Sequence, residues 1–237
     1  MGNVLSQCTC LKGVYDKGEE NLAFKAEMSD SPVGVAFTKH ESTMLAELKE
    51  YYIQFLRGNA KKIKQIRIEN RELSDKGSKL VALLIPELSE LQELALRNNQ
   101  IGTVGAQKLA NELARLTGLK VLTIADNQLG DEGMAAIAGP ISYMKSLKVL
   151  NLEGNGFGSD SLGEILENLS EFEGLKVINL KGNNISSRGI KKLAKTLSEV
   201  KTLEEFYFDD VKERDLVEIQ NALPNVSLNK PKNPEAK

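Results

Sequence analysis

The sequence predicts an α/β fold: a right-handed solenoid with a curved parallel sheet inside, helices outside and a capping helix at its N-terminal end. Three observations predict it. Similar stretches begin at positions 63, 91, 119, 147, 175 and 203, which are 28 residues apart. Each stretch alternates apolar and polar residues, as a strand with one buried face does. Each is followed by apolar residues at helical spacing. A fixed period of this length is the signature of stacked repeats.

The first ten residues, MGNVLSQCTC, predict lipid attachment. Glycine follows the initiator methionine and serine stands at position 6, which is the N-myristoylation pattern, with the α-amine of Gly2 as the acyl acceptor. A single myristoyl chain binds a membrane with an association constant of only about 10⁴ M⁻¹, so stable anchoring needs a second signal. Cys8 and Cys10 are the candidates, as S-palmitoylation sites. The alternatives are a chance match at the start of the chain and two idle thiols.

The N-terminal region then divides into a tether and a cap. Residues 1–37 mix glycine, serine and charged residues without periodicity, so we expect an acylated segment and flexible tether there. Within residues 38–60, one helical stripe is formed by Leu45, Leu48, Tyr52, Phe55 and Leu56. Such a helix, placed before a repeat array, is expected to cover the open apolar end of the first repeat.

The repeat domain is expected over residues 61–228, as about six copies of the pattern L-x-x-L-x-L-x-x-N-x-L, each followed by a helix. An asparagine recurs after the strands, at Asn99, Asn127, Asn155 and Asn183, and is expected to satisfy the turning backbone with its donor and its acceptor. Residue types that cap helices follow the first five stretches, at Asp75, Thr103, Asp131, Ser159 and Ser187. Glycines two residues later, such as Gly105, are expected to bring each helix close to the strand layer.

Two copies depart from the pattern. The third helix contains Gly139 and Pro140, which are expected to kink or shorten it. The sixth copy has Val211 in place of the asparagine and a shorter connection after it, as a terminal repeat does. Residues 229–237, with two prolines and three lysines, are expected to form a disordered tail.

This pattern resembles the ribonuclease-inhibitor-like leucine-rich repeats, over about residues 61–228. The resemblance implies a protein partner bound on the concave sheet or the loops above it, and no shared chemistry. One branch, the Ran GTPase-activating proteins, has a similar repeat and stimulates GTP hydrolysis. Those proteins are longer and have an acidic C-terminal tail, whereas this chain ends in a short basic one. None of their functional residues is carried over to this sequence.

The partner is expected on the strand positions that face away from the core, which are the third, fifth and seventh of each copy. The middle copies are small and mildly apolar there, through Val121, Val149, Val177 and Ala125. Arginines lie toward one end and an acidic patch with a tyrosine toward the other, and both residue types anchor interfaces. The predicted partner-binding residues are Arg67, Arg97, Asn151, Glu153, Lys181, Tyr207 and Asp209. The alternative is an ordinary solvated sheet face.

Composition and motifs narrow the function further. A net charge of -2 argues against the concentrated basic surface that nucleic acid requires. One histidine and two early cysteines indicate no metal site, and no nucleophile–base pair, paired carboxylates or cofactor motif indicates an enzyme. The predicted function is an adaptor, lipid-anchored on the cytoplasmic face of the plasma membrane or of a flagellar or ciliary membrane. The alternatives are a regulator that accelerates a small GTPase with an arginine such as Arg71 or Arg97, and a soluble repeat protein.

Overall fold

The computed structural model describes residues 62–163, 167 and 172–229. The predicted lipid-attachment residues Gly2, Cys8 and Cys10 lie outside this part of the chain, as does the predicted capping helix at 38–60. The same holds for residues 230–237 of the predicted tail and for most of the fourth repeat's predicted helix.

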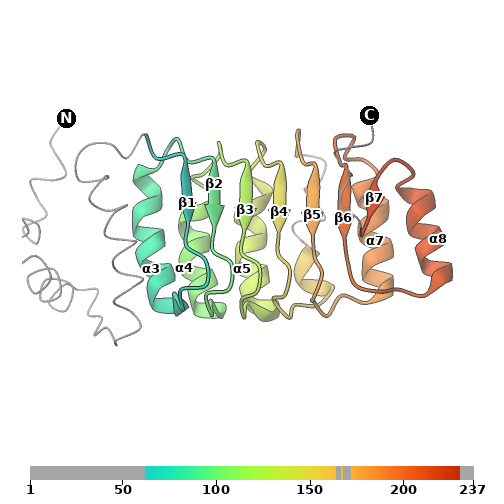
Figure 1. Cartoon of the computed structure of the whole chain (residues 1–237), viewed down its shortest axis with the longest axis horizontal. Coiled ribbons are helices and arrows are strands. Elements are labelled where there is room, and N and C mark those ends of the chain that lie inside the picture. The colour runs from blue at the N-terminus through green and yellow to red at the C-terminus, as the bar shows by residue number, and fades with distance from the viewer. Residues whose placement is uncertain (1–61, 164–166, 168–171, 230–237) are drawn as a thin grey trace, which may run out of the picture. The chain divides into compact units, whose positions relative to one another are not determined.

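Seven short strands form one parallel sheet in chain order (Figure 1). They are β1 (Gln65–Arg67), β2 (Glu93–Ala95), β3 (Val121–Thr123), β4 (Val149–Asn151), β5 (Val177–Asn179), β6 (Glu205–Tyr207) and β7 (Ser227–Leu228). From β1 to β6 each residue pairs with the residue one repeat further on, as Leu122 does with Leu150. The predicted α/β solenoid with one strand per 28-residue repeat is therefore confirmed. The seventh strand was not predicted, because a shorter connection brings it beside β6 out of the period.

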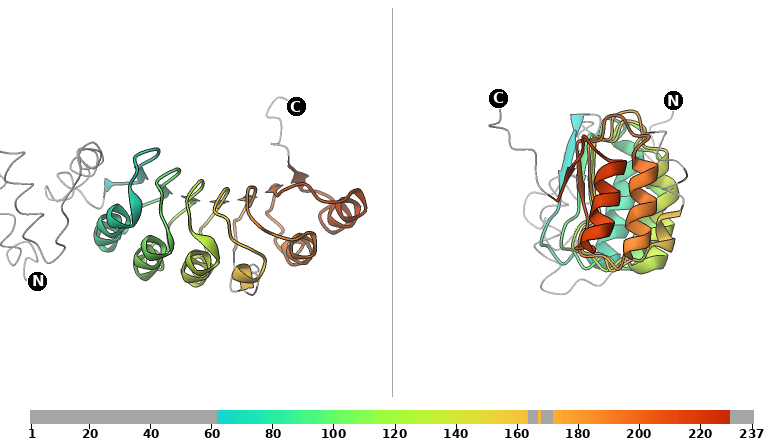
Figure 2. Two further views of the ribbon diagram at one scale, coloured as in Figure 1. Left: turned by 90° about the horizontal axis from the view of Figure 1, so that it is seen from below. Right: turned by 90° about the vertical axis from the view of Figure 1, so that its right-hand side faces the viewer.

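The helices all lie on one side of the sheet, so that the strands line the inner side of the arc of repeats and the helices its outer side (Figure 2). They are α3 (Ser74–Leu84), α4 (Thr103–Leu113), α5 (Gly130–Ser142), α7 (Ser187–Leu197) and α8 (Glu213–Ala222), with short 3₁₀ turns η5 (Ile85–Glu87) and η6 (Asp160–Leu162). The predicted shortening of the third helix is wrong, since α5 runs 13 residues and passes through Pro140. The proline lies in the last turn, where only one backbone hydrogen bond of the helix is lost.

The core lies between the sheet and the helices. Its strand side is formed by one residue from each strand, among them Leu94, Leu122, Leu150, Ile178 and Phe206, all 0–1% exposed. The predicted helix residues Val81, Leu109, Ile137 and Leu193 meet them and are equally buried. Each strand and helix therefore contributes one layer to a continuous apolar stack, which is what stabilises a solenoid whose repeats contact only their neighbours.

Four of the five residues predicted to cap their own helices instead bond to the following repeat, which corrects that prediction, and the fifth helix, α7, is capped by Ser186 and not by Ser187. Asp75 lies inside α3, and its Oδ1 accepts hydrogen bonds from the backbone N–H groups of Gly102 and Gly105, each at 2.8 Å, at the start of α4. Asp131 likewise accepts from the N–H of Gly158. Helix starts of successive repeats lie side by side, so a side chain at one start reaches the unsatisfied N–H groups of the next.

The glycines near the helix starts, which were expected to bring each helix close to the strand layer, lie against the preceding helix and against a residue just before their own helix. A Cβ on Gly105 would lie 2.5 Å from Asp75 Oδ1 and 2.9 Å from Ser78 Oγ, both in the preceding helix. On Gly133 it would lie 3.3 Å from the Cβ of Ala106, also in the preceding helix. The missing side chain thus leaves room for the carboxylate of the previous repeat.

Candidate protein-binding face

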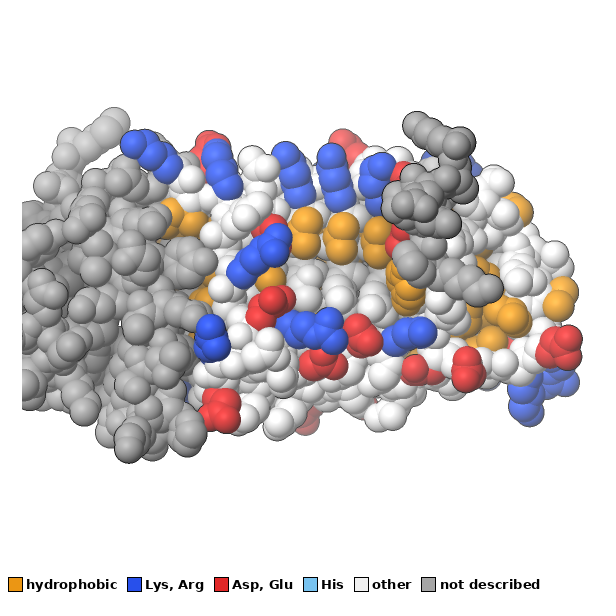
Figure 3. Space-filling view, viewed as in Figure 1, with side chains coloured by type: hydrophobic (Ala, Val, Ile, Leu, Met, Phe, Trp, Pro, Cys, Tyr) orange, Lys and Arg blue, Asp and Glu red, His pale blue; other side chains and the backbone are white. Residues whose placement is uncertain are grey.

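The inner face of the sheet has an apolar row at its centre. Val121, Val149 and Val177 are the first residues of β3, β4 and β5, pair in register with one another and are half-buried. The corresponding residues of the flanking strands are carboxylates, Glu93 in β2 and Glu205 in β6. The apolar row therefore extends over three repeats and ends at an acidic residue on both sides, and Figure 3 shows it as a line of hydrophobic side chains.

A row of lysines runs beside the valines, and the sequence prediction missed it. Lys120, Lys148 and Lys176 precede the three valines, and their backbones are bonded in register, with N–O distances of 2.8 Å. The Nζ of Lys120 donates to the neutral amide of Gln92 at 2.9 Å, and that of Lys176 pairs with Glu204 at 2.7 Å. Lys148 is exposed, and its side chain has no partner among the described residues. Figure 3 shows basic side chains lined up along this edge of the apolar row.

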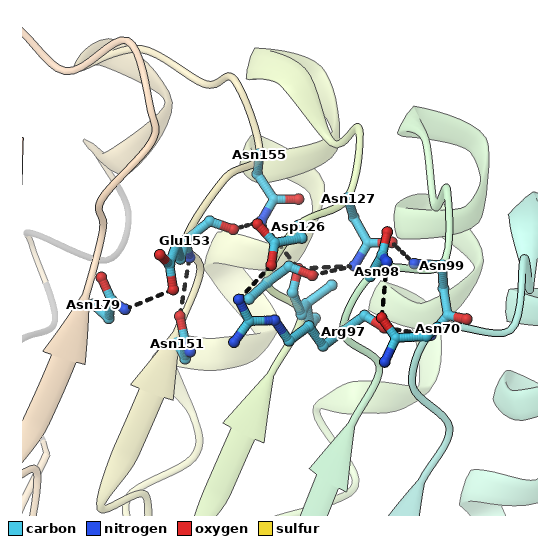
Figure 4. Close-up of polar contacts among 12 residues, drawn as sticks. Asn70, Arg97, Asn98, Asn99, Asp126, Asn127, Asn151, Glu153, Asn155 and Asn179 are labelled. Atoms are coloured by element: carbon cyan, nitrogen blue, oxygen red, sulfur yellow. Dashed lines mark hydrogen bonds and ion pairs between the residues drawn. The ribbon is translucent and has the colours of Figure 1, made fainter.

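Small polar residues follow the valines on the same face and order the turns behind them. Asn151 and Asn179 end β4 and β5, and each Oδ1 accepts from the backbone N–H two residues on, at 3.1 Å. The Nδ2 of Asn179 also donates to the carboxylate of Glu153 at 3.1 Å (Figure 4). Two predicted partner-binding residues, Asn151 and Glu153, therefore lie next to each other in fixed positions, with Lys181 in the equivalent position one repeat on.

The turn after each of the strands β1 to β5 contains a residue with positive φ, a feature that the sequence signals through glycine, asparagine or aspartate. These residues are Asn70, Asn98, Asp126, Gly154 and Gly182, with φ between 52° and 68°. In the first repeats their side chains are linked, since Nδ2 of Asn98 donates to Oδ1 of Asn70 at 2.8 Å. Arg97 is held at the same edge by an ion pair of 2.7 Å with Asp126 (Figure 4).

Behind this edge the recurring asparagines form a buried ladder, as predicted, except that Oδ1 of Asn155 has no hydrogen-bond partner among the described residues. Oδ1 of Asn127 accepts from the backbone N–H groups of Asn99 and Ile101, each at 3.0 Å. Its Nδ2 donates to three backbone carbonyls, those of Leu96, Ile124 and Ala125. The asparagines are structural, and their side chains are unavailable to a partner.

Asp209 has a structural role that its sequence position does not reveal. The sixth repeat has Val211 where the ladder asparagine belongs, and Asp209 takes its place by accepting from the N–H groups of Gly182 at 2.9 Å and Asn183 at 3.3 Å. Its carboxylate ends the ladder at the last full repeat. Its predicted contact with a partner stays a prediction.

The remaining predicted residues lie at opposite ends of the face and are not brought together. Arg67 on β1 pairs with Glu93 at 2.7 Å. Tyr207 on β6 donates its hydroxyl proton to Glu205 at 2.8 Å, and burial together with this hydrogen bond raises the pKa of Tyr207 to about 12. Two positions expected to face outward are buried, since Ala95 is 4% and Ala125 0% exposed. The small alanine side chain leaves these places covered by their neighbours.

Two negative findings concern the described residues alone. They contain no group of three or more histidine, cysteine, aspartate or glutamate side chains that could hold a metal ion. Within the same residues, no helix combines the length and apolar character needed to cross a membrane.

The order and spacing of the elements define the class of the fold, an α/β solenoid with one strand per repeat. Comparisons with models of known protein families match several of the repeats separately. A family model described as Leucine Rich repeat matches residues 89–110, 116–138 and 175–194, and a second, described as Leucine Rich Repeat, matches residues 146–171. The chain contains leucine-rich repeats, which typically bind protein partners.

Two matching solved structures come from Caenorhabditis elegans and Listeria monocytogenes. The tropomodulin C-terminal domain of Caenorhabditis elegans is 14% identical, with a TM-score of 0.47, and the match covers 79% of this chain and 93% of that one. An internalin from Listeria monocytogenes is 13% identical, with a TM-score of 0.27, and the match covers 77% of this chain and 87% of that one. No curated protein sequence matches this chain significantly.

Proposed function

We propose that the protein is an adaptor that binds another protein on the inner face of its sheet and is attached to the cytoplasmic face of a membrane by acyl chains. The observation that carries the binding function is the three-repeat row of valines beside a row of lysines on β3, β4 and β5. Apolar side chains in the middle of a polar rim form the usual core of a protein interface. The anchor rests on the N-terminal pattern at Gly2, with Cys8 and Cys10 as second sites.

The binding function is tested by Val149→Glu, which places a charge in the centre of the apolar row. Val104→Glu is the matched control, because Val104 is 54% exposed on α4 at the outer surface. Proteins captured from the native cell by the wild-type chain should be retained by Val104→Glu and reduced about ten-fold or more by Val149→Glu, as for the loss of a central anchor. Equal capture by both variants would refute binding on the inner face.

The anchor is tested separately by Gly2→Ala, which removes the acyl acceptor but leaves the repeats unchanged. The wild-type chain should be found with membranes, and its N-terminal peptide should have the additional mass of a myristoyl group. Gly2→Ala should move the chain to the supernatant. A variant that stays on membranes, or a wild-type peptide of unmodified mass, would contradict acylation while leaving the binding function standing.

The alternative of a GTPase-activating protein gains no observation in its favour. An arginine that stabilises charge on a transferring phosphate must extend freely into the partner's site. Arg97 is paired with Asp126, and Arg71 also has an interaction partner within the chain. A protein-holding function needs neither arginine to be released.

A further inference from the structure

We infer that the partner places an acidic, amphipathic α-helix along the row of Val121, Val149 and Val177, across the strands and parallel to the line of repeats. This inference rests on the proposed function and names the kind of partner that the inner face fits. Two properties of the described residues carry it, namely the spacing of the valines and the charge of the row beside them.

The spacing favours a helix over an extended peptide. Neighbouring strands lie about 4.8 Å apart, so the first and third valines of the row are about 9.6 Å apart. Two turns of an α-helix advance about 10.8 Å, a difference of about 1.2 Å over the row. In an extended peptide, residues on one face recur every 6.8 Å or so, and two such steps exceed the row by about 4 Å. One apolar side chain per helical turn therefore meets one valine per repeat.

The length of the apolar row limits the helix to a short contact. Glu93 and Glu205 end the row, so three anchor residues at positions i, i+4 and i+7 cover it, within about three helical turns. The two carboxylates are already occupied within the chain, Glu93 by Arg67 and Glu205 by Tyr207. They limit the apolar contact at both ends and provide no free charge for the partner.

The charge beside the valines determines which helix fits. Of the three lysines, Lys176 is paired with Glu204, whereas Lys120 is bonded to a neutral amide and Lys148 has no partner among the described residues. Two uncompensated positive charges thus lie at one edge of the apolar row. A carboxylate once per turn beside the anchor residues would face them. Exposed pairs contribute little affinity, up to about 1 kcal/mol each, but they orient a partner and select against a basic one.

A display library tests this inference on the full chain. Its members are 14-residue peptides in a helix-favouring host, with leucine at i, i+4 and i+7 and random residues on both flanks. A second library of equal diversity, with leucine at alternate positions, is selected in parallel for comparison. Selection should enrich the helical library, with aspartate or glutamate on one flank. The selected peptide should gain helical circular dichroism on binding and lose about ten-fold in affinity with Lys148→Glu. Lys108→Glu, on the outer face of α4, is the matched control.

Each other outcome refutes a defined part of the reasoning. The acidic helix would be refuted if selection enriched the alternating library. It would also be refuted if the selected flanks were basic or showed no preference for either charge. The same holds if Lys148→Glu and Lys108→Glu bind the selected peptide equally well. If native capture is lost in Val149→Glu while the selected peptides are extended, the helix inference fails and the adaptor function stands. If Val149→Glu leaves native capture unchanged, the adaptor function itself fails.

Discussion

Replacing Asn127 with alanine tests the asparagine ladder, because this side chain is only 7% exposed and makes five hydrogen bonds to the backbone. Its Oδ1 accepts from the N–H groups of Asn99 and Ile101, which lie in the preceding repeat. A buried N–H left unpaired costs about 1–3 kcal/mol, so the two together cost about 2–6 kcal/mol before the released carbonyls are counted. Against a total stability of about 5–15 kcal/mol, this is a large loss.

Asn155 provides a sharp comparison at the same position of the next repeat. Its Nδ2 also donates to three backbone carbonyls, but its buried Oδ1 has no hydrogen-bond partner among the described residues. Asn155→Ala therefore releases no backbone N–H. Its cost in free energy of unfolding should be lower than that of Asn127→Ala by about 2 kcal/mol or more. Asn184→Ala, at an exposed residue with one bond to the carbonyl of Gly156, should change stability by about 0.5 kcal/mol or less.

The assay is urea unfolding of the three variants and the wild type, followed by circular dichroism, with free energies compared at equal slopes. The expected order of destabilisation is Asn127→Ala, then Asn155→Ala, then Asn184→Ala. Equal costs for the first two variants would show that the accepting oxygen contributes nothing, and would refute the account of the ladder as a two-way backbone partner.

Two further predictions concern the turns and the last helix. Gly182 has a φ of +68°, and a Cβ there would lie 3.1 Å from the backbone of Gly154, so Gly182→Ala should lower the free energy of unfolding by about 1–2 kcal/mol or more. Gly118→Ala, with open space around it, should be neutral in the same urea titration. The Nζ of Lys191 lies 3.0 Å from the carboxylate of Asp215 and holds the pKa of that carboxyl below its ordinary value of 3.8. The ion pair therefore stabilises the fold above pH 3.8, and this stabilisation is lost as the pH falls through the folded-state pKa. Asp215→Asn should therefore flatten the fall in urea midpoint between pH 7 and pH 3, and an unchanged fall would contradict it.

The ladder and the core are the parts of the fold that the sequence predicts down to single residues. A period of 28 residues assigns one role to every copy of a position, and a buried amide such as Asn127 can have only a hydrogen-bonding role. The helix starts are different. Asp75 is of a residue type that caps helices, but the period does not tell which backbone lies within its reach. The carboxylate therefore bonds to Gly102 and Gly105 of the next repeat, and only the packing of helix against helix reveals this.

The candidate face was predicted in part, for a related reason. Strand alternation tells which side chains share a face inside a strand, and this correctly places the valines and Asn151 on the inner side. The lysines precede the strands, so strand alternation does not predict which way their side chains point. Only the hydrogen bond between the backbones of Lys120 and Lys148 shows that they lie in one row. Alternation also fails for Ala125, since the chain has already left β3 at that residue and the side chain is buried.

Pairing within the chain determines which charged side chains at the edge of the sheet remain available to a partner. In the early repeats the positive-φ position is occupied by asparagine or aspartate, and Asp126 uses its carboxylate to neutralise Arg97. For Lys181 the residue in the corresponding place is Asp210 of the sixth repeat. No ion pair joins Lys181 to a described residue, whereas Arg97 has one. The available charge thus lies beside β4 and β5, next to the valine row, and not at the arginine end where residue type alone places it.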